Sequence, residues 1–228
     1  MRRTLILFAR IPRLGAGKSR LARDIGPVSA LSFERAMLMR SLRRFGRDRR
    51  WQLRLAVTPD RAARRWSGRF AGWKSAAPSA IGPCAIGGRR FALPPYNTDY
   101  FRAALVVVPQ GGGDLGARMR RALAARPPGP AMLVGTDIPG LTAAHIAAAF
   151  ALLGRHDVVF GPASDGGFWL VGCRHRPPNF GAVRWSTRHA LGDVLANLPK
   201  SLSVGFAAML DDVDDGASYR ELRNIRGF

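Results

Sequence analysis

The sequence predicts an α/β fold in which a mainly parallel central sheet carries helices on both faces. Strand-like apolar runs alternate with helical segments along the chain, which is typical of parallel strands joined by crossover helices. The runs TLILFA (4–9) and AMLVGTD (131–137) are almost continuously apolar, as expected for strands covered on both faces of a sheet. Together the two observations indicate an α/β sandwich built on a mainly parallel sheet.

In the first part of the chain, a glycine loop follows strand 4–9 and leads into a short helix. Gly26-Pro27 ends that helix, because a proline removes a backbone donor and clashes with the preceding turn. Apolar residues at helical spacing then predict a helix over 28–45. A strand follows over 51–60, ending at a Pro-Asp turn, and the segment 60–66 predicts another helix.

In the second part, the segments 104–110 and 131–137 predict strands, and a glycine turn at 111–113 feeds a helix that ends near 125. Thr142 is a suitable N-cap for a helix over 143–153. A strand, a turn and a second strand are expected over 156–172. Ser186 is the expected N-cap of a helix over 186–198, followed by a strand over 203–210 and a helix over 216–225.

We expect a single domain over 1–228, because this length supports one large core. Residues 75–101 are rich in Gly, Pro and Ala and show neither helical nor strand periodicity. We interpret the stretch at about 75–104 as an irregular excursion from the domain, either a lid or a structural insertion.

The net charge of +21 is the outlying feature of the composition. Three of the 36 basic residues are lysines, Lys18, Lys74 and Lys200, so 33 are arginines. The arginines are scattered along the chain and do not form a basic tract with interleaved aromatic residues. This distribution favours attraction of small polyanionic substrates over dedicated nucleic-acid binding. A basic nucleic-acid-binding protein remains an alternative.

We expect a cytoplasmic protein, because the sequence shows no signal-peptide core, no membrane helix and only two cysteines. The apolar stretch 5–9 is too short for the core of a signal peptide, and no run approaches the ~20 apolar residues of a membrane helix. Cys84 and Cys173 form no C-x-x-C pair and cannot make a disulfide scaffold, and nothing in the sequence supports a single disulfide between them.

The segment ARIPRLGAGKSRLA (9–22) has the look of a phosphate-binding P-loop, because it follows a strand and contains Gly17-Lys18-Ser19. A P-loop, however, needs a glycine where this chain has Pro12, and proline removes an amide from the phosphate cradle. The helix after the lysine also ends early, at Gly26. A P-loop NTPase is therefore a minor alternative, and Lys18 is better explained as a flexible charge that faces phosphate oxygens, with Arg20 beside it.

Aspartates stand where the chain changes direction. Asp137 directly follows the predicted strand 131–137, at the edge where ligands collect in open α/β sheets. A carboxylate at this place can bind Mg²⁺, which prefers oxygen ligands and shares them with a diphosphate. Asp165 lies in a Gly-rich turn and can accept hydrogen bonds from hydroxyl groups. The run DDVDD (211–215) offers further carboxylates that could complete a metal site.

Several segments together resemble the GT-A superfamily of nucleotide-diphospho-sugar transferases and nucleotidyltransferases. Within it, the sequence is most similar to a family of small bacterial glycosyltransferases, some of them linked to arsenosugar biosynthesis. The similar segments occur in order and cover most of the chain outside roughly 75–104: LILFARIPRLGAGKSRLA, VPQGGGDLGARMRRAL, LVGTDIPGL, DVVFGPASDGGFWLVG, RWST and LDDVDDGASYREL.

The resemblance implies a Rossmann-like GT-A fold with a nucleotide site, an acceptor side and a metal site. Nucleotide binding falls to Pro12, Gly15, Lys18, Arg20, Gln110, Gly113 and Asp114. Asp165, Gly166, Gly167 and Trp185 would line the sugar or acceptor side, and Asp137 with Asp214 would hold the metal. Lys18, Asp137 and Asp165 are the expected catalytic residues. The chain reads Asp215-Gly216 where the family pattern has a threonine-containing turn.

The expected activity is a Mg²⁺-dependent (or Mn²⁺-dependent) glycosyl transfer from a nucleotide sugar to a small acceptor. The alternative within the same fold is a nucleotidyltransferase, in which a phosphorylated small molecule attacks the α-phosphate of an NTP. Both reactions use the same loop, lysine and metal, so the sequence leaves the choice open.

Overall fold

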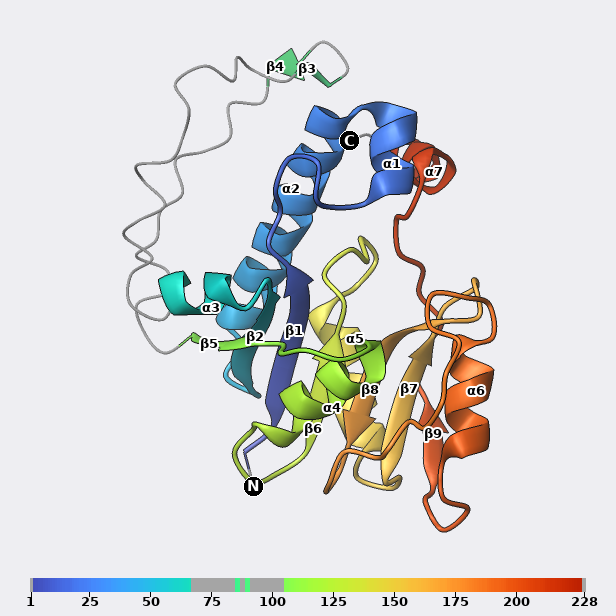
Figure 1. Cartoon of the computed structure of the whole chain (residues 1–228). Helices are drawn as coiled ribbons and strands as arrows, with labels where there is room; N and C mark the ends of the chain where they lie inside the picture. The colour runs from blue at the N-terminus through green and yellow to red at the C-terminus, as the bar shows by residue number, and fades with distance from the viewer. Residues whose placement is uncertain (1, 67–84, 87–88, 91–104, 227–228) are drawn as a thin grey trace.

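The computed structural model describes residues 2–66, 85–86, 89–90 and 105–226, and its core is a seven-stranded sheet with the order β5-β2-β1-β6-β8-β7-β9 (Figure 1). The strands are β1 (Thr4–Arg10), β2 (Gln52–Thr58), β5 (Val106–Pro109), β6 (Ala131–Val134), β7 (Val158–Pro162), β8 (Phe168–Cys173) and β9 (Val204–Phe206). All neighbouring pairs are parallel except those of β8, which runs antiparallel to β6 and β7. The predicted mainly parallel sheet is confirmed.

Helices cover both faces of the sheet, as the sequence predicts. They are α1 (Ser19–Ile25), α2 (Pro27–Gly46), α3 (Arg61–Trp66), α4 (Leu115–Ala124), α5 (Ala143–Leu152), α6 (Ala190–Asn197) and α7 (Gly216–Arg226). Leu5 and Leu7 of β1 pack with α2, α3 and α5 on one face. Ile6 faces the opposite side, in the cluster that contains residues of α4 and α6.

The long helix α2 joins the sheet to a small cluster above its carboxyl edge. Leu42 and Phe45, near its end, pack in the core of the sheet. Phe33, near its start, packs with α1 and α7, and its ring lies edge-on to Tyr219 with 5.6 Å between centroids. Figure 1 shows α1 and α7 beyond the end of β1, so this cluster lies beyond the carboxyl edge of the sheet.

A small second sheet pairs β3 (Ala85–Ile86) with β4 (Arg89–Arg90) in antiparallel fashion. These four residues belong to the expected excursion at about 75–104, and the remainder of that interpretation lies outside the described residues. None of the helices in the described ranges is long and apolar enough to cross a membrane.

Two local predictions have opposite outcomes. Thr142 caps α5, and its hydroxyl accepts from the His145 backbone while the His145 ring accepts from the Thr142 N–H. Ser186 is not a helix cap: α6 begins at Ala190, and Ser186 has a positive φ of 62°. The reason is a tight turn, in which the Thr187 hydroxyl donates to the Arg184 carbonyl and delays the helix.

The last strand is also shorter than predicted. The β9 pairing ends at Phe206, whereas the sequence predicts a strand to 210. The chain nevertheless continues along β7, because the N–H of Ala207 donates to the Phe160 carbonyl and the N–H of Leu210 to the Pro162 carbonyl. This segment brings the acidic run 211–215 to the carboxyl edge of the sheet.

Candidate functional site

Lys18 lies at the centre of the candidate site, in the loop between β1 and α1. Its ammonium is 2.7 Å from Asp137 Oδ2, 2.6 Å from Asp214 Oδ1 and 3.9 Å from Asp212 Oδ2. The side chain is 12 % exposed. Burial by itself lowers the pKa of the Lys18 ammonium, but the ion pairs with Asp137 and Asp214 outweigh burial and raise the pKa above its ordinary value. Lys18 therefore carries its positive charge at neutral pH.

Three carboxylates from two distant segments converge on this lysine. Asp137 follows β6, and Asp212 and Asp214 lie in the extended segment after β9. Side chains alternate along an extended chain, so Val213 points into the small apolar cluster while its two neighbours face the lysine. The N–H of Val213 donates to the Asp137 carbonyl at 3.1 Å and fastens the two segments together.

The cluster carries more negative charge than Lys18 neutralises. One oxygen from each of Asp137, Asp212 and Asp214 lies within 4.8 Å of the others. Burial and the neighbouring charge of Asp137 raise the pKa of Asp212 to about 6. Arg20 offers a weaker contact, with its Nη1 3.9 Å from Asp214 Oδ2 on a side chain that is 68 % exposed. Three convergent carboxylates that already hold an ammonium form a donor set suited to a divalent cation.

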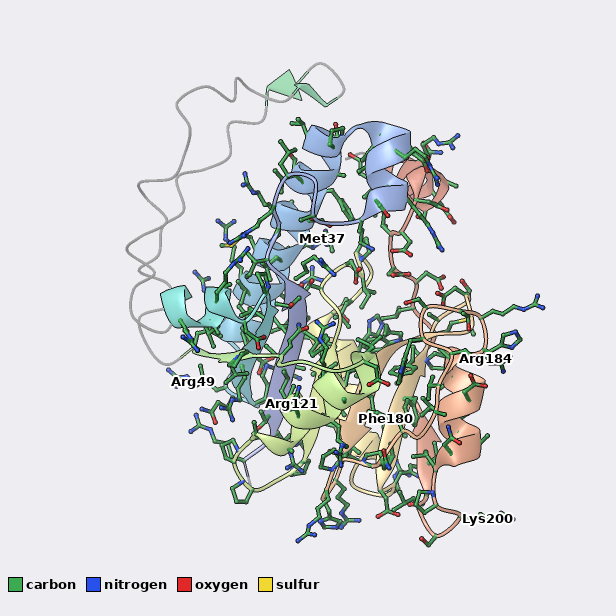
Figure 2. The ribbon with its side chains drawn as sticks, viewed as in Figure 1. Met37, Arg49, Arg121, Phe180, Arg184 and Lys200 are labelled. Atoms are coloured by element: carbon green, nitrogen blue, oxygen red, sulfur yellow. The ribbon has the colours of Figure 1, made fainter. Side chains whose placement is uncertain are left out.

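A pocket of about 270 Å³ opens beside the cluster. Its walls come from the end of β1, the glycine loop, the middle of α2 and the segments after β6 and β9. The lining residues are Phe8, Arg10, Pro12, Gly17, Lys18, Glu34, Met37, Leu38, Thr136, Asp137 and Asp214. Figure 2 shows Met37 on α2 beside the glycine loop. The pocket thus holds the loop proline, the lysine and both predicted metal ligands together.

Glu34 of α2 holds the backbone of the glycine loop, a role that sequence reasoning missed. Its carboxylate accepts from the Lys18 N–H at 2.8 Å. A Cβ at Gly17 would collide with the same carboxylate. The start of α1 therefore faces an internal carboxylate, where a P-loop would face a phosphate. One signal was available: Glu34 is one of only two glutamates in the chain.

The predicted nucleotide residues after β5 form a group around the start of α4. Gln110 is buried, and its amide donates to the carbonyls of Ala9 and Ala56, both at 3.0 Å, while its side-chain oxygen accepts from Arg118. Gly113, with φ of 93°, turns the chain into α4. The Gln110 side chain thereby links β1, β2 and α4.

Asp114 caps α4 and meets the predicted acceptor residue Trp185. One Asp114 oxygen accepts from the Ala117 N–H at 2.7 Å, and the other accepts from the Trp185 indole at 3.2 Å. The indole also covers Gly116, where a Cβ would lie 2.6 Å from the ring. Phe168 and Phe180 pack edge-on against Trp185. The structure therefore joins a predicted nucleotide residue to a predicted acceptor residue.

The turn between β7 and β8 carries Asp165, Gly166 and Gly167. Asp165 Oδ1 accepts from the Gly167 N–H at 2.8 Å, and its charge contributes to the raised pKa of Asp212. The preceding Ser164 N–H donates to Asp211 Oδ1 at 2.9 Å. Asp165 is thus close enough for its charge to act on Asp212 of the carboxylate cluster, and its side chain is exposed.

The structure brings Lys18, Asp137 and Asp214 into direct contact, with Pro12 in the same pocket and Arg20 3.9 Å from Asp214. Gly15 turns the loop with φ of 73°. Asp212 joins the cluster although the sequence favoured Asp214 alone. The alternation D-V-D is the signal that could have identified Asp212, because residues i and i+2 of an extended chain share a face.

Comparisons with known proteins agree with the predicted fold. Residues 91–187 match a family model described as uncharacterized proteins conserved in bacteria (DUF2064), which covers less than half of the chain. No curated protein sequence matches the chain.

Two of the solved structures that resemble the chain over nearly its whole length have TM-scores above 0.5. One is a protein from Desulfovibrio desulfuricans G20 provisionally named a nucleotide-diphospho-sugar transferase, with a TM-score of 0.73, 22 % identity, and 99 % of this chain and 88 % of that chain covered. Another is 4-diphosphocytidyl-2C-methyl-D-erythritolsynthase from Anaerococcus prevotii DSM 20548, with a TM-score of 0.55, 8 % identity, and 100 % and 99 % covered. The chain has the fold of the nucleotide-diphospho-sugar transferases, as its motifs predict.

Proposed function

We propose that this protein is a divalent-metal-dependent glycosyltransferase that takes a sugar from a nucleotide-diphosphate donor and passes it to a small acceptor. The observation that carries the proposal is the meeting of Lys18, Asp137 and Asp214 beside a pocket at the carboxyl edge of the sheet. In open α/β folds this edge binds the ligand. The Desulfovibrio protein, which has a similar fold, carries the name of a nucleotide-diphospho-sugar transferase, and this supports a nucleotide-sugar donor.

Asp137 and Asp214 would hold the metal, with Asp212 as a third carboxylate, which extends the predicted pair. Mg²⁺ or Mn²⁺, when bound, supplies positive charge that offsets the charge developing on the leaving nucleotide diphosphate. Lys18 and Arg20 would contact phosphate oxygens and favour departure of the same group. Pro12 and Gly15 shape the loop that presents these two cations.

The nucleotide would extend toward the start of α4, along Gly113 and Asp114. Gln110 would act there by holding the loop, because its amide is already committed to two backbone carbonyls. Gly166, Gly167 and Trp185 would border the sugar or acceptor. Asp165 would accept a hydrogen bond from the acceptor hydroxyl and is the candidate to take its proton, because it is exposed beside the cluster.

A screen of nucleotides and nucleotide sugars by thermal shift, each with and without Mg²⁺, tests the donor site. A ligand at about 100 times its Kd stabilises the protein by roughly 2.7 kcal/mol, which corresponds to about 5–10 °C for a chain of this size. We expect one series of nucleotide sugars to give a Mg²⁺-dependent shift.

Asp137→Ala should abolish that shift, because it removes a proposed metal ligand. Asp48→Ala is the matched control: Asp48 pairs with Arg50 before β2, at the opposite edge of the sheet, and its loss should leave the shift intact. A Mg²⁺-dependent shift that persists in Asp137→Ala would contradict the proposal.

Nucleotidyl transfer is the second candidate, supported by the similar fold of the Anaerococcus synthase at a TM-score of 0.55. Here a phosphorylated acceptor would attack the α-phosphate of an NTP, and the Lys18 ammonium would contact the phosphate oxygens of the NTP. The products separate the two reactions. Pyrophosphate released from an NTP with a phosphorylated acceptor favours nucleotidyl transfer, whereas a nucleoside diphosphate released from a nucleotide sugar favours glycosyl transfer.

A further inference from the structure

The Lys18 ammonium lies in contact with the carboxylate oxygens that a metal would use. It is 2.7 Å from Asp137 Oδ2 and 2.6 Å from Asp214 Oδ1, and these two residues belong to the cluster whose oxygens converge within 4.8 Å. A divalent cation that used the same two oxygens would be held within a few ångströms of the ammonium. Like charges at such a separation repel strongly in a partly buried site, so the two cations compete for one position.

The side chain of Lys18 is able to leave while its backbone stays in place. The Lys18 N–H is bound to Glu34 Oε1 at 2.8 Å, and Glu34 belongs to the long helix α2. The pocket of about 270 Å³ is lined by Lys18 itself, so rotation of the flexible lysine stem moves the ammonium into open space. An anion in that pocket would give the ammonium a new partner.

We propose that Lys18 is a built-in counter-cation of the carboxylate cluster, which a divalent metal displaces and which then pairs with the phosphates of the incoming nucleotide. This inference rests on the proposed function, since it takes the cluster as the metal site. It makes metal and phosphate binding mutually dependent: the metal binds weakly alone, because it must displace the lysine, and tightly when phosphate receives the lysine.

Titration of the purified protein with Mn²⁺ alone, followed by the electron paramagnetic resonance of free Mn²⁺, tests the competition. We expect Lys18→Met to bind Mn²⁺ at least about tenfold more tightly than the wild type. Lys200→Met removes the same charge from the opposite end of the molecule from Met37, which lines the pocket, and should bind like the wild type (Figure 2). Mn²⁺ affinity in Lys18→Met that is equal to or below that of the wild type would overturn the inference.

The same variants are then titrated with magnesium pyrophosphate as the phosphate probe. Lys18→Met should bind it at least tenfold more weakly than the wild type, the reverse of its effect on Mn²⁺. A lysine that only stabilises the loop would, on removal, weaken both ligands. Opposite changes are therefore the signature of the exchange, and parallel changes would refute it.

The wild-type protein provides a measurement that does not depend on a variant folding. The chain has three lysines, so side-chain ammonium signals of protein labelled with ¹⁵N-lysine are few, and Lys200→Met identifies one of them. Saturating magnesium pyrophosphate should shift the Lys18 signal and leave the Lys200 signal in place. A Lys18 signal that stays unchanged at saturation would contradict displacement.

These outcomes distinguish failure of the proposed exchange from failure of the proposed function. If neither the wild type nor Lys18→Met binds Mn²⁺, with or without pyrophosphate, the metal site and the proposed function both fail. If both proteins bind Mn²⁺ equally well, the metal site stands and the exchange alone is wrong.

Discussion

At the scale of single residues, Glu34 sets the course of the glycine loop. Its carboxylate occupies the space beside Gly17 and accepts from the backbone of Lys18. A negative charge is favourable near the first amides of a helix, so Glu34 compensates for the absence of a side-chain cap on α1. The lysine side chain is then free to extend toward the carboxylates.

Gly17→Ala should lower the free energy of unfolding by about 1–2 kcal/mol, because the new Cβ displaces Glu34 from its hydrogen bond with the loop. In a Glu34→Ala background the same change should cost much less, since the obstructing carboxylate is gone. Gly112→Ala, where a Cβ meets nothing within 4 Å, is the control. Urea unfolding of the wild type, the two single variants and the double variant measures the coupling energy between Gly17 and Glu34. Strictly additive free-energy changes would contradict this explanation of Gly17.

A second residue-scale prediction concerns Cys173, which is fully buried in β8. Burial raises the pKa of its thiol to about 11, from 9.0 for an exposed thiol. In the folded state the Cys173 thiol therefore stays protonated to a higher pH than in the unfolded state. The free energy of unfolding consequently falls as the pH rises from about 9 to 11. In a Cys84→Ser variant, iodoacetamide should label Cys173 at pH 8 only after unfolding. Rapid labelling of the native protein at pH 8 would contradict this.

At the scale of elements, the turn between β7 and β8 is fixed from two sides. The Leu191 N–H at the start of α6 donates to the Gly166 carbonyl at 3.0 Å, and the Ser164 N–H donates to Asp211. Gly166 has φ of 82°, and a Cβ there would collide with the backbone of Arg188. The turn therefore links α6 to the acidic segment and holds Asp165 near the cluster.

Gly166→Ala should destabilise the protein by more than about 2 kcal/mol, because the left-handed backbone and the contact with Arg188 both oppose a side chain. Gly192→Ala is the counterpart within α6, where a Cβ meets nothing within 4 Å. That change should stabilise by about 0.5–1 kcal/mol, since alanine favours a helix over glycine. Thermal unfolding of both variants measures the contrast, and equal effects would refute the role given to Gly166.

At the scale of the whole molecule, the sheet collects charge of both signs at its carboxyl edge. The chain carries a net charge of +21, yet the candidate metal ligands are three of its 13 aspartates. The small cluster of α1, α2 and α7 holds Val213 between two of these ligands and so couples packing to the site. The net positive charge of the protein attracts anions, while the cluster of three carboxylates offers a binding site for a cation.

Salt should distinguish binding in the pocket from attraction by the surface. Any binding of duplex DNA by this arginine-rich surface should fall with a log–log slope of about −0.9 per neutralised phosphate. The Mg²⁺-dependent thermal shift with a nucleotide sugar should change far less between 50 and 200 mM salt, on the order of a few-fold in Kd, because few phosphates are contacted. Nanomolar DNA binding that survives 200 mM salt would instead favour the nucleic-acid alternative.

The order of strands and helices was predictable because its signals are local. Apolar runs, the Gly26-Pro27 break and the Thr142 cap each act within a few residues, and the structure confirms all three. The cap at Ser186 was wrong because a turn held by Thr187 overrides the local preference. Asp137 was identifiable for a related reason: it ends an apolar strand, and the ends of parallel strands share an edge.

The fold class, and the positions of a lysine and an aspartate at strand ends, follow from local sequence patterns. The contact of Lys18 with Asp214, 196 residues away, exists only in the folded chain. The same holds for Asp212, which joins the cluster, and for Glu34, which holds the loop. The tertiary structure also decided that β8 runs antiparallel between β6 and β7. The physical reason is that secondary structure follows from neighbours along the chain, whereas electrostatic pairing depends on distances that exist only after the chain has folded.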